Sequence, residues 1–286
     1  MIVVTGATGQ LGRLVIQKLL QTVPAGQIVA LARDPAKAAD LVALGVQVRQ
    51  ADYTRPAALD AALAGAQKLL LISSSEVGQR VAQHRAVIDA AMRAGVTLVA
   101  YTSLLHADTS PLGLALEHKE TESMLKASGL PFVLLRNGWY TENYAASVPA
   151  ALAHGAVIGS AGDGRIASAA RADYAAAAAA VLTNEGQAGR VYELAGDSAY
   201  TLAEFAAEIA RQSGQAVVYK NLPEADYQAA LVGVGLPQPL AAMLADSDTG
   251  ASKGGLFDGS RQLSALIGRA TTPLRDTVAE ALKGSE

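Results

Sequence analysis

The sequence predicts an α/β protein with a doubly wound parallel sheet and a smaller α/β lobe at its C-terminal end. Short apolar runs alternate with helical patterns along the first half of the chain, and the pattern loosens after about residue 150. Strands that alternate with helices are typical of βαβ units, whose parallel sheet is covered on both faces. We therefore expect residues 1–150 to form one domain and residues 151–286 a smaller lobe, with some chain exchanged between them.

The first twelve residues are the strongest local signal. They read Met-Ile-Val-Val-Thr-Gly-Ala-Thr-Gly-Gln-Leu-Gly, and apolar residues follow at helical spacing. The glycines thus stand between a buried strand and a helix N-terminus, where backbone N–H groups and the helix dipole bind phosphate. We expect the first glycine to make the turn, the second to admit a pyrophosphate and the third to let the helix pack closely. The segment predicted to bind a dinucleotide is Gly6, Ala7, Thr8, Gly9, Gln10, Leu11 and Gly12.

Five further buried strands are predicted before residue 137, each a short apolar run separated from the next by a helical segment. The strands cover residues 27–32, 46–50, 68–72, 96–101 and 131–136, and the helices cover residues 37–44, 56–64, 81–94 and 116–127. Two βαβαβ halves give the strand order 3-2-1-4-5-6 of a Rossmann fold. Right-handed crossovers place all strand C-termini at one edge of the sheet, where we expect the functional site.

The elements predicted after residue 150 are shorter. A Thr201/Glu204 capping box opens a helix, and the Gly-, Ser- and Asp-rich stretch from Ser247 to Gly259 predicts a mobile loop. Residues 173–182 form an alanine-dense helix that can pack closely on a neighbour. The remaining expected elements are short strands and turns over 156–168, strands over 191–194 and 217–219, and helices over 201–212, 225–231, 238–244 and 262–267.

The composition excludes several classes of function. The chain has 286 residues, 51% of them hydrophobic, no cysteine and a net charge of −3. It lacks a membrane-spanning run, a secretory leader and a basic block, so we expect no membrane and no nucleic-acid partner. The absence of cysteine excludes disulfides and thiolate catalysis. The four histidines show no metal-ligand spacing, so we expect no metal and assign the protein to the cytoplasm.

The residues after the second and third strands bear on the choice of nucleotide. A basic residue after the second strand accommodates the 2′-phosphate of NADP, whereas an acidic residue there selects NAD. Arg33 occupies this position, which favours NADP(H); the alternative is a surface arginine paired with Asp34. Asp52, after the third strand, is placed to accept a hydrogen bond from the adenine amino group, or else to cap the following helix.

Four parts of the sequence resemble the NmrA-like branch of the atypical short-chain dehydrogenases. They are residues 5–12, Arg33, the Tyr-Thr-Ser at 101–103 and the stretch Leu-Arg-Asn-Gly-Trp-Tyr-Thr-Glu-Asn-Tyr at 135–144. The similarity covers nearly the whole chain. It implies a bilobal fold, NADPH as the cofactor and hydride delivery to small quinones.

Carried over to matching positions, the family pattern assigns the pyrophosphate to the glycine segment and the 2′-phosphate to Arg33. It implies that the segment after the fourth strand lines the ribose, that the segment after the sixth strand lies beside the nicotinamide, and that a segment of the second lobe closes over it. These segments are, in turn, Ser73, Ser74 and Ser75; Asn137, Gly138, Trp139, Tyr140, Thr141 and Glu142; and Ser168, Ala169, Ala170 and Arg171.

The chain departs from ordinary short-chain dehydrogenases at their Tyr-x-x-x-Lys motif. The corresponding residues read His118-Lys119-Glu120-Thr121-Glu122, so the acid–base pair is absent. A quinone accepts hydride readily, so the site mainly has to hold the acceptor ring over nicotinamide C4. We expect Asn143 or Tyr140 to donate a hydrogen bond to the quinone oxygen. Ser103, after the fifth strand, stands where the family's hydroxyl donor is usually found.

Several of these side chains also have a purely structural explanation. Trp139, Tyr140 and Tyr144 could be hydrophobic packing between the lobes, and Asn143 a polar helix residue. The helical setting of His118 favours a surface position over a proton donor, and His84 and His154 are likewise expected at the surface.

The function predicted is NADPH-dependent reduction of a small quinone. One alternative is a protein that senses NADP(H) and regulates a partner without turnover, and another is a reductase of a different conjugated acceptor such as a dye. The loops over residues 104–116 and 247–259 would shape the acceptor pocket. A homodimer is compatible with these features.

Overall fold

The computed structural model describes residues 1–284, which divide into two compact units. Unit 1 contains residues 1–107, 116–137 and 171–192, and unit 2 contains residues 108–115, 138–170 and those from 193 onward. Each unit therefore draws on three separate stretches of the chain. The expected division into a domain of residues 1–150 and a lobe of residues 151–286 stays a prediction.

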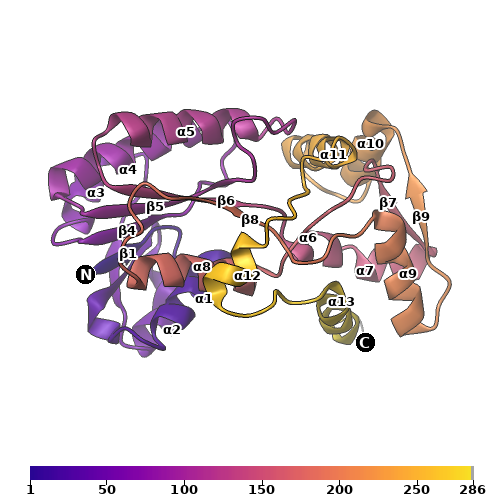
Figure 1. Ribbon diagram of the computed structural model, residues 1–286, viewed down its shortest axis with the longest axis horizontal. Coiled ribbons are helices and arrows are strands. Elements are labelled where there is room, and N and C mark those ends of the chain that lie inside the picture. The colour runs from indigo at the N-terminus through magenta and orange to yellow at the C-terminus, as the bar shows by residue number, and fades with distance from the viewer. Residues whose placement is uncertain (285–286) are drawn as a thin grey trace. The chain divides into compact units, whose positions relative to one another are not determined.

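A seven-stranded sheet forms the centre of unit 1 and has the order β3-β2-β1-β4-β5-β6-β8 (Figure 1). The pairs from β3 to β6 are all parallel. The first six strands have the predicted order, so the predicted doubly wound sheet is confirmed, and the strand near residue 191 joins its edge beside β6. The strands are β1 (Ile2–Val4), β2 (Ile28–Ala32), β3 (Gln47–Gln50), β4 (Lys68–Leu71), β5 (Leu98–Leu104), β6 (Phe132–Asn137) and β8 (Val191–Leu194).

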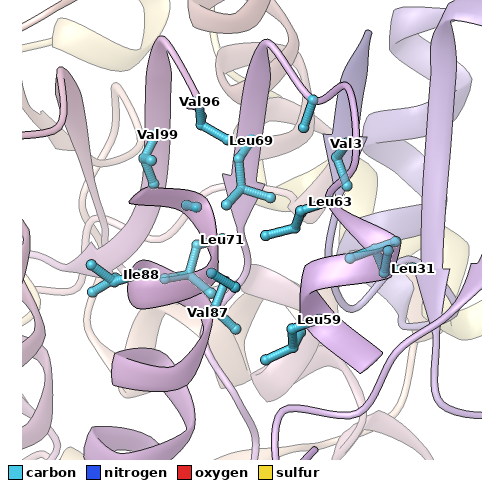
Figure 2. Packing of buried hydrophobic residues seen from close by; sticks show 14 of the residues in the cluster. Val3, Leu31, Leu59, Leu63, Leu69, Leu71, Val87, Ile88, Val96 and Val99 are labelled. Atoms are coloured by element: carbon cyan, nitrogen blue, oxygen red, sulfur yellow. The ribbon is translucent and has the colours of Figure 1, made fainter. Parts of the chain in front are cut away.

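Helices cover both faces of this sheet. Alternate residues of a strand point to opposite faces, and in the central strands β2, β4 and β5 both sets are mostly apolar and buried. Figure 2 shows Leu69 and Leu71 of β4 packed with Leu59 and Val87 on one face. On the other face lie α1 and α8, which pack against each other (Figure 1). The helices are α1 (Gln10–Leu19), α2 (Ala39–Ala43), α3 (Pro56–Ala62), α4 (Arg80–Ala94), α5 (Ala115–Ala127) and α8 (Arg171–Thr183), with 3-10 helices η1 (Ala25–Gln27) and η2 (Pro35–Ala38).

Unit 2 combines short helices with a two-stranded parallel sheet of β7 (Ala156–Gly159) and β9 (Val218–Asn221). The predicted capping box is confirmed: Glu204 N donates to Thr201 Oγ1 over 3.1 Å, and Thr201 N donates to Glu204 Oε2 over 2.8 Å. The helices are α6 (Thr141–Ala145), α7 (Val148–His154), α9 (Leu202–Ser213), α10 (Glu224–Gly233), α11 (Gln238–Ser252), α12 (Gln262–Ile267) and α13 (Leu274–Lys283).

The mobile loop predicted from Ser247 to Gly259 is wrong over its first half, because α11 continues to Ser252. Ser247, Asp248, Gly250 and Ala251 of this helix are buried. A Cβ atom at Gly250 would lie 2.6 Å from the side chain of Leu112. Small and polar residues here serve close packing, although their composition is typical of a loop.

Among residues 1–284, no helix has both the length and the apolar character needed to cross a membrane. Over the same residues, the His, Asp and Glu side chains form no group of three or more that could hold a metal ion.

Candidate functional site: a glycine loop and an aromatic segment

The chain turns sharply between β1 and α1 at the predicted phosphate loop. Gly6 has φ +58°, and Gly9 N donates to Gly6 O over 3.0 Å. Gly9 is the N-cap of α1, and the first backbone bond of the helix runs from Arg13 N to Gly9 O over 3.0 Å. The N–H groups of the first turn therefore have no acceptor within the helix, and they carry its partial positive charge. Such a terminus can bind a pyrophosphate.

The third glycine is fixed by close packing. A Cβ atom at Gly12 would lie 2.4 Å from the carbonyl oxygen of Gly6 and 2.7 Å from Cα of Ala7. Any side chain there would push α1 away from the loop. The close helix packing predicted for Gly12 is thus present, whereas pyrophosphate binding by residues 6–12 stays a prediction.

Arg33 lies directly after β2 and is exposed. Its Nη1 donates to Glu76 Oε1 over 2.7 Å, and Gln83 Nε2 donates to the other oxygen of this carboxylate over 2.8 Å. Asp34 instead accepts a hydrogen bond from Ala36 N and caps η2. The alternative pairing of Arg33 with Asp34 is therefore not the one observed. A guanidinium has five N–H donors in a planar fork, so the contact to Glu76 leaves donors for a phosphate.

Asp52 caps a turn before α3. Its Oδ1 accepts hydrogen bonds from the backbone N and the hydroxyl of Thr54, at 2.9 and 2.8 Å. These bonds, the backbone one foremost, lower the pKa of Asp52. The local turn explains this residue, while hydrogen bonding to an adenine stays a prediction.

The segment after β4 is held by side chains of neighbouring elements. Ser73 N donates to Thr102 Oγ1 over 2.8 Å, and Ser74 N donates to His84 Nε2 over 3.0 Å. Arg80 Nε donates to the Ser74 carbonyl over 2.6 Å. Both backbone groups of Ser74 are thus fixed from α4. The segment predicted to line a ribose, Ser73–Ser75, is rigid for this reason.

His84 is completely buried, so its predicted surface position is wrong. Burial, followed by the charge of Arg80, lowers its pKa to about 3. Because Nε2 accepts from Ser74, the proton belongs on Nδ1, which lies 2.9 Å from Thr121 Oγ1. His84, on α4, is therefore a neutral side chain that forms hydrogen bonds with the backbone of Ser74 and with Thr121 of α5.

Ser103 lies inside β5 rather than after it. Its hydroxyl donates to Glu122 Oε1 over 2.6 Å, and its cross-strand partner Arg136 donates to both oxygens of Glu122, over 2.9 and 2.8 Å. All three side chains are buried. Sequence reasoning missed this ion pair, because it depends on the register of two strands against α5. The structure commits the Ser103 proton to Glu122, and a catalytic role for Ser103 stays a prediction.

His118 is also buried, which corrects the predicted surface position. The Tyr101 hydroxyl lies 2.7 Å from His118 Nδ1. Burial, followed by the charges of Arg80 and His84, lowers the pKa of His118 to about 3. Burial therefore favours the uncharged imidazole at neutral pH, at the position that the resemblance assigns to the tyrosine of ordinary short-chain dehydrogenases.

Asn137 ends β6 at the predicted functional edge of the sheet. It is buried, and its Oδ1 has no hydrogen-bond partner among residues 1–284. A buried acceptor without a partner is costly, so it marks a place where a ligand N–H can bind. The carboxamide of a nicotinamide carries such a donor.

In unit 2 the structure brings together two predicted site segments. Trp139 O accepts from Ala169 N over 3.1 Å, and Thr141 N donates to Ala169 O over 2.9 Å, which makes a short bridge around Tyr140. The hydroxyls of Thr141 and Ser168 are 2.8 Å apart. Residues 138–142 and 168–170 are therefore adjacent, whereas Arg171 begins α8 in unit 1.

The aromatic segment continues into α6. Tyr140 precedes this helix, Asn143 lies exposed on its first turn, and Trp139 and Tyr144 are buried. The rings of Trp139 and Tyr144 have centroids 6.4 Å apart. The two predicted quinone-oxygen donors, Tyr140 and Asn143, thus lie within one helical turn of each other, and their catalytic role stays a prediction.

The comparisons with known proteins agree with this geometry. A family model described as NAD(P)H-binding matches residues 6–185. The chain is 67% identical over 278 residues to quinone oxidoreductase 2 of Escherichia coli K12, with 97% of each protein covered. A crystal structure of the NADPH-dependent quinone oxidoreductase of E. coli complexed with NADPH matches with a TM-score of 0.97 and 66% identity, over 99% of this chain and 100% of that chain.

A more distant enzyme is also similar along the whole chain. The triphenylmethane reductase of Citrobacter sp. complexed with NADP(H) has a TM-score of 0.94 and 40% identity, over 98% of this chain and 100% of that chain. An Aspergillus flavus oxidoreductase with an NmrA-like family domain is 30% identical over 75% of this chain and 72% of that protein. The resemblance found in the sequence is confirmed, and the chain belongs to the NAD(P)H-binding family.

Proposed function

We propose that this protein is an oxidoreductase that transfers hydride from NADPH to a small quinone. The observation that carries the proposal is the 67% identity to a quinone oxidoreductase over 97% of both proteins. A match of 278 residues extends over both units. The geometry of the glycine loop and of the aromatic segment supports the same activity.

The residues present fit NADPH. The N-terminus of α1 offers backbone donors for the pyrophosphate, and Arg33 offers a guanidinium for the 2′-phosphate. The unpartnered Oδ1 of Asn137 would accept a hydrogen bond from the nicotinamide carboxamide. Ser73–Ser75 would lie along the ribose, held by His84 and Arg80.

The bound cofactor supplies the hydride, and one proton from solvent completes the conversion of quinone to hydroquinone. Tyr140 and Asn143 would donate hydrogen bonds to the quinone oxygen that gains negative charge. A strong protein acid is not required, since the hydroquinone anion is delocalised. This agrees with the neutral state of His118 at the position of the missing tyrosine.

Oxidation of NADPH in the presence of a benzoquinone, followed by absorbance, tests the proposal. We expect fast quinone-dependent turnover with NADPH and slower turnover with NADH. Arg33→Ala should raise the KM for NADPH about ten- to one hundred-fold, as expected for loss of a charge-assisted hydrogen bond, and should leave the KM for NADH nearly unchanged. Arg93→Ala, which removes an exposed arginine paired with Asp60, is the matched control.

Two results would contradict these assignments. Tight NADPH binding without turnover of any acceptor would contradict the reductase assignment and favour a protein that senses NADP(H). An equal loss of NADPH and NADH affinity in Arg33→Ala would remove Arg33 from the 2′-phosphate site.

The similarity to a triphenylmethane reductase gives a second acceptor class to test. A triphenylmethane dye should be assayed beside the quinone at equal concentration. A higher kcat/KM for the dye would identify a dye reductase with the same cofactor site.

A further inference from the structure

Unit 2 contains a buried carboxylate that neither the family pattern nor the quinone chemistry uses. Asp248 lies in the middle of α11 and is 2% exposed. Its Oδ1 accepts a hydrogen bond from the Tyr144 hydroxyl over 2.8 Å, and its Oδ2 accepts one from Ser160 N over 2.9 Å. A Cβ atom at Gly159 would lie 2.6 Å from Oδ2, so the backbone of β7 approaches the carboxylate closely.

All donors to this carboxylate are neutral. Among residues 1–284, Asp248 forms no ion pair with a lysine, arginine or histidine. Burial raises its pKa and also that of Tyr144, which keeps the phenol protonated. Burying a charge without a cation is costly. The carboxylate of Asp248 satisfies two buried donors, the backbone N–H of Ser160 and the hydroxyl of Tyr144.

Tyr144 links Asp248 to the aromatic segment. Its ring centroid lies 6.4 Å from that of Trp139 and 6.1 Å from that of Phe205. The Tyr144 hydroxyl donates its proton to Asp248, so it is not free to donate to a substrate, and the ring is held in one position. The hydrogen bond therefore sets the rotation and depth of a ring that packs beside Trp139.

We propose that Asp248 is a positioning residue for the acceptor: through Tyr144 it fixes the aromatic segment Trp139–Tyr144 against which the quinone ring packs. This rests on the proposed function, in which Tyr140 and Asn143 of that segment donate hydrogen bonds to the quinone oxygen. Asp248 touches neither substrate nor cofactor in this proposal. Its effect should be larger on acceptor binding than on NADPH binding, because residues 139–142 are also expected beside the nicotinamide.

Two variants distinguish the positioning of Tyr144 by Asp248 from an effect of the negative charge of Asp248. Asp248→Ala removes the hold on Tyr144. Asp248→Asn keeps the shape: its amide oxygen can accept from Ser160 N and its amide nitrogen can donate to the Tyr144 oxygen, although the phenol proton then loses its acceptor. Asp226→Asn, which neutralises an exposed carboxylate of α10, is the control for loss of one charge. All variants should first be shown to fold by circular dichroism.

Trp139 makes the structural consequence directly measurable, because it is the only tryptophan of the chain. We expect Asp248→Ala to shift the tryptophan emission maximum and to raise the KM for a benzoquinone about ten-fold, since small displacements in a binding site have large kinetic effects. The dissociation constant for NADPH should change by a clearly smaller factor than the quinone KM. Asp248→Asn should recover most of the loss in both readouts.

Three results would overturn the proposal. They are an unchanged emission maximum and quinone KM in folded Asp248→Ala, a loss of NADPH affinity as large as the rise in quinone KM, and an Asp248→Asn variant as impaired as Asp248→Ala. If the unaltered protein reduces no quinone, the proposed function fails, while the emission of Trp139 still decides whether Asp248 positions the segment.

Discussion

The two units each bury a carboxylate to the same extent but stabilise it differently. Glu122 of unit 1 is 2% exposed and receives two hydrogen bonds from the guanidinium of Arg136, one from Ser103 and an ion pair with Lys126. Asp248 of unit 2 is also 2% exposed, yet within residues 1–284 it accepts hydrogen bonds only from the Tyr144 phenol and the Ser160 backbone N–H.

This difference separates a structural group from a functional one. Glu122 joins β5, β6 and α5 through opposite charges, and such a pair is strongly destabilised when one partner is removed. Asp248 is held by neutral donors, so its loss should change the position of Tyr144 more than the stability of the fold. The two carboxylates should therefore differ in how much their loss lowers the free energy of unfolding.

The largest effect should follow from Arg136→Met, which leaves Glu122 buried without its main cation. We expect the free energy of unfolding to fall by about 3–5 kcal/mol, measured by urea denaturation. Arg93→Met, which breaks the exposed pair with Asp60, should cost less than about 1 kcal/mol. Equal losses in the two variants would show that Glu122 does not depend on Arg136.

The second largest effect should be the loss of stability at low pH, which arises from two buried histidines of unit 1. The pKa values of His84 and His118 are about 3 in the folded protein, below the unfolded value of about 6.5. Between these pH values the unfolded chain binds more protons, so the free energy of unfolding falls by about 1.4 kcal/mol per pH unit for each histidine as pH decreases. Asp248 has the opposite sign, because its raised pKa costs stability as pH rises.

Urea denaturation between pH 7 and pH 5 measures the acid effect. His118→Gln should remove about half of the dependence. An identical pH dependence in His118→Gln would mean that this imidazole is not held neutral by burial.

The smallest effect is expected for Asp248→Asn. Its amide oxygen can still accept from Ser160 N, but the phenol proton of Tyr144 loses the carboxylate that accepts it, so the free energy of unfolding should fall by about 1–2 kcal/mol. The same urea measurement applies. A loss as large as that of Arg136→Met would place Asp248 with Glu122 as a structural group and would end the contrast between the units.

The order of the sheet followed from the sequence because each strand and helix left its own local pattern. The glycine loop was predicted for the same reason. The positive φ of Gly6 and the close approach of Gly12 to Gly6 and Ala7 both depend on residues within the first twelve of the chain. The partner of a strand is a non-local property. Residues 191–194 were accordingly predicted as a strand, but their place beside β6 was not.

The buried polar groups escaped prediction for a physical reason. The helix that carries His118 and Glu122 is rich in charged residues, so its buried face is not visible as an apolar stripe. Asp248 lies in a Gly-, Ser- and Asp-rich stretch whose composition is typical of a loop. In both cases the partner that makes burial favourable, Arg136 or Tyr144, lies far away in the sequence.

The division of the chain into units has a consequence for biosynthesis. Unit 1 acquires α8 and the start of β8 only from residues 171–192, after the first part of unit 2 has been made. Until that stretch leaves the ribosome, the apolar face of α1 lacks the alanine-rich helix that covers it. A nascent chain released before residue 171 would therefore expose this surface and be a substrate for chaperones and proteases, even though its glycine loop is already complete.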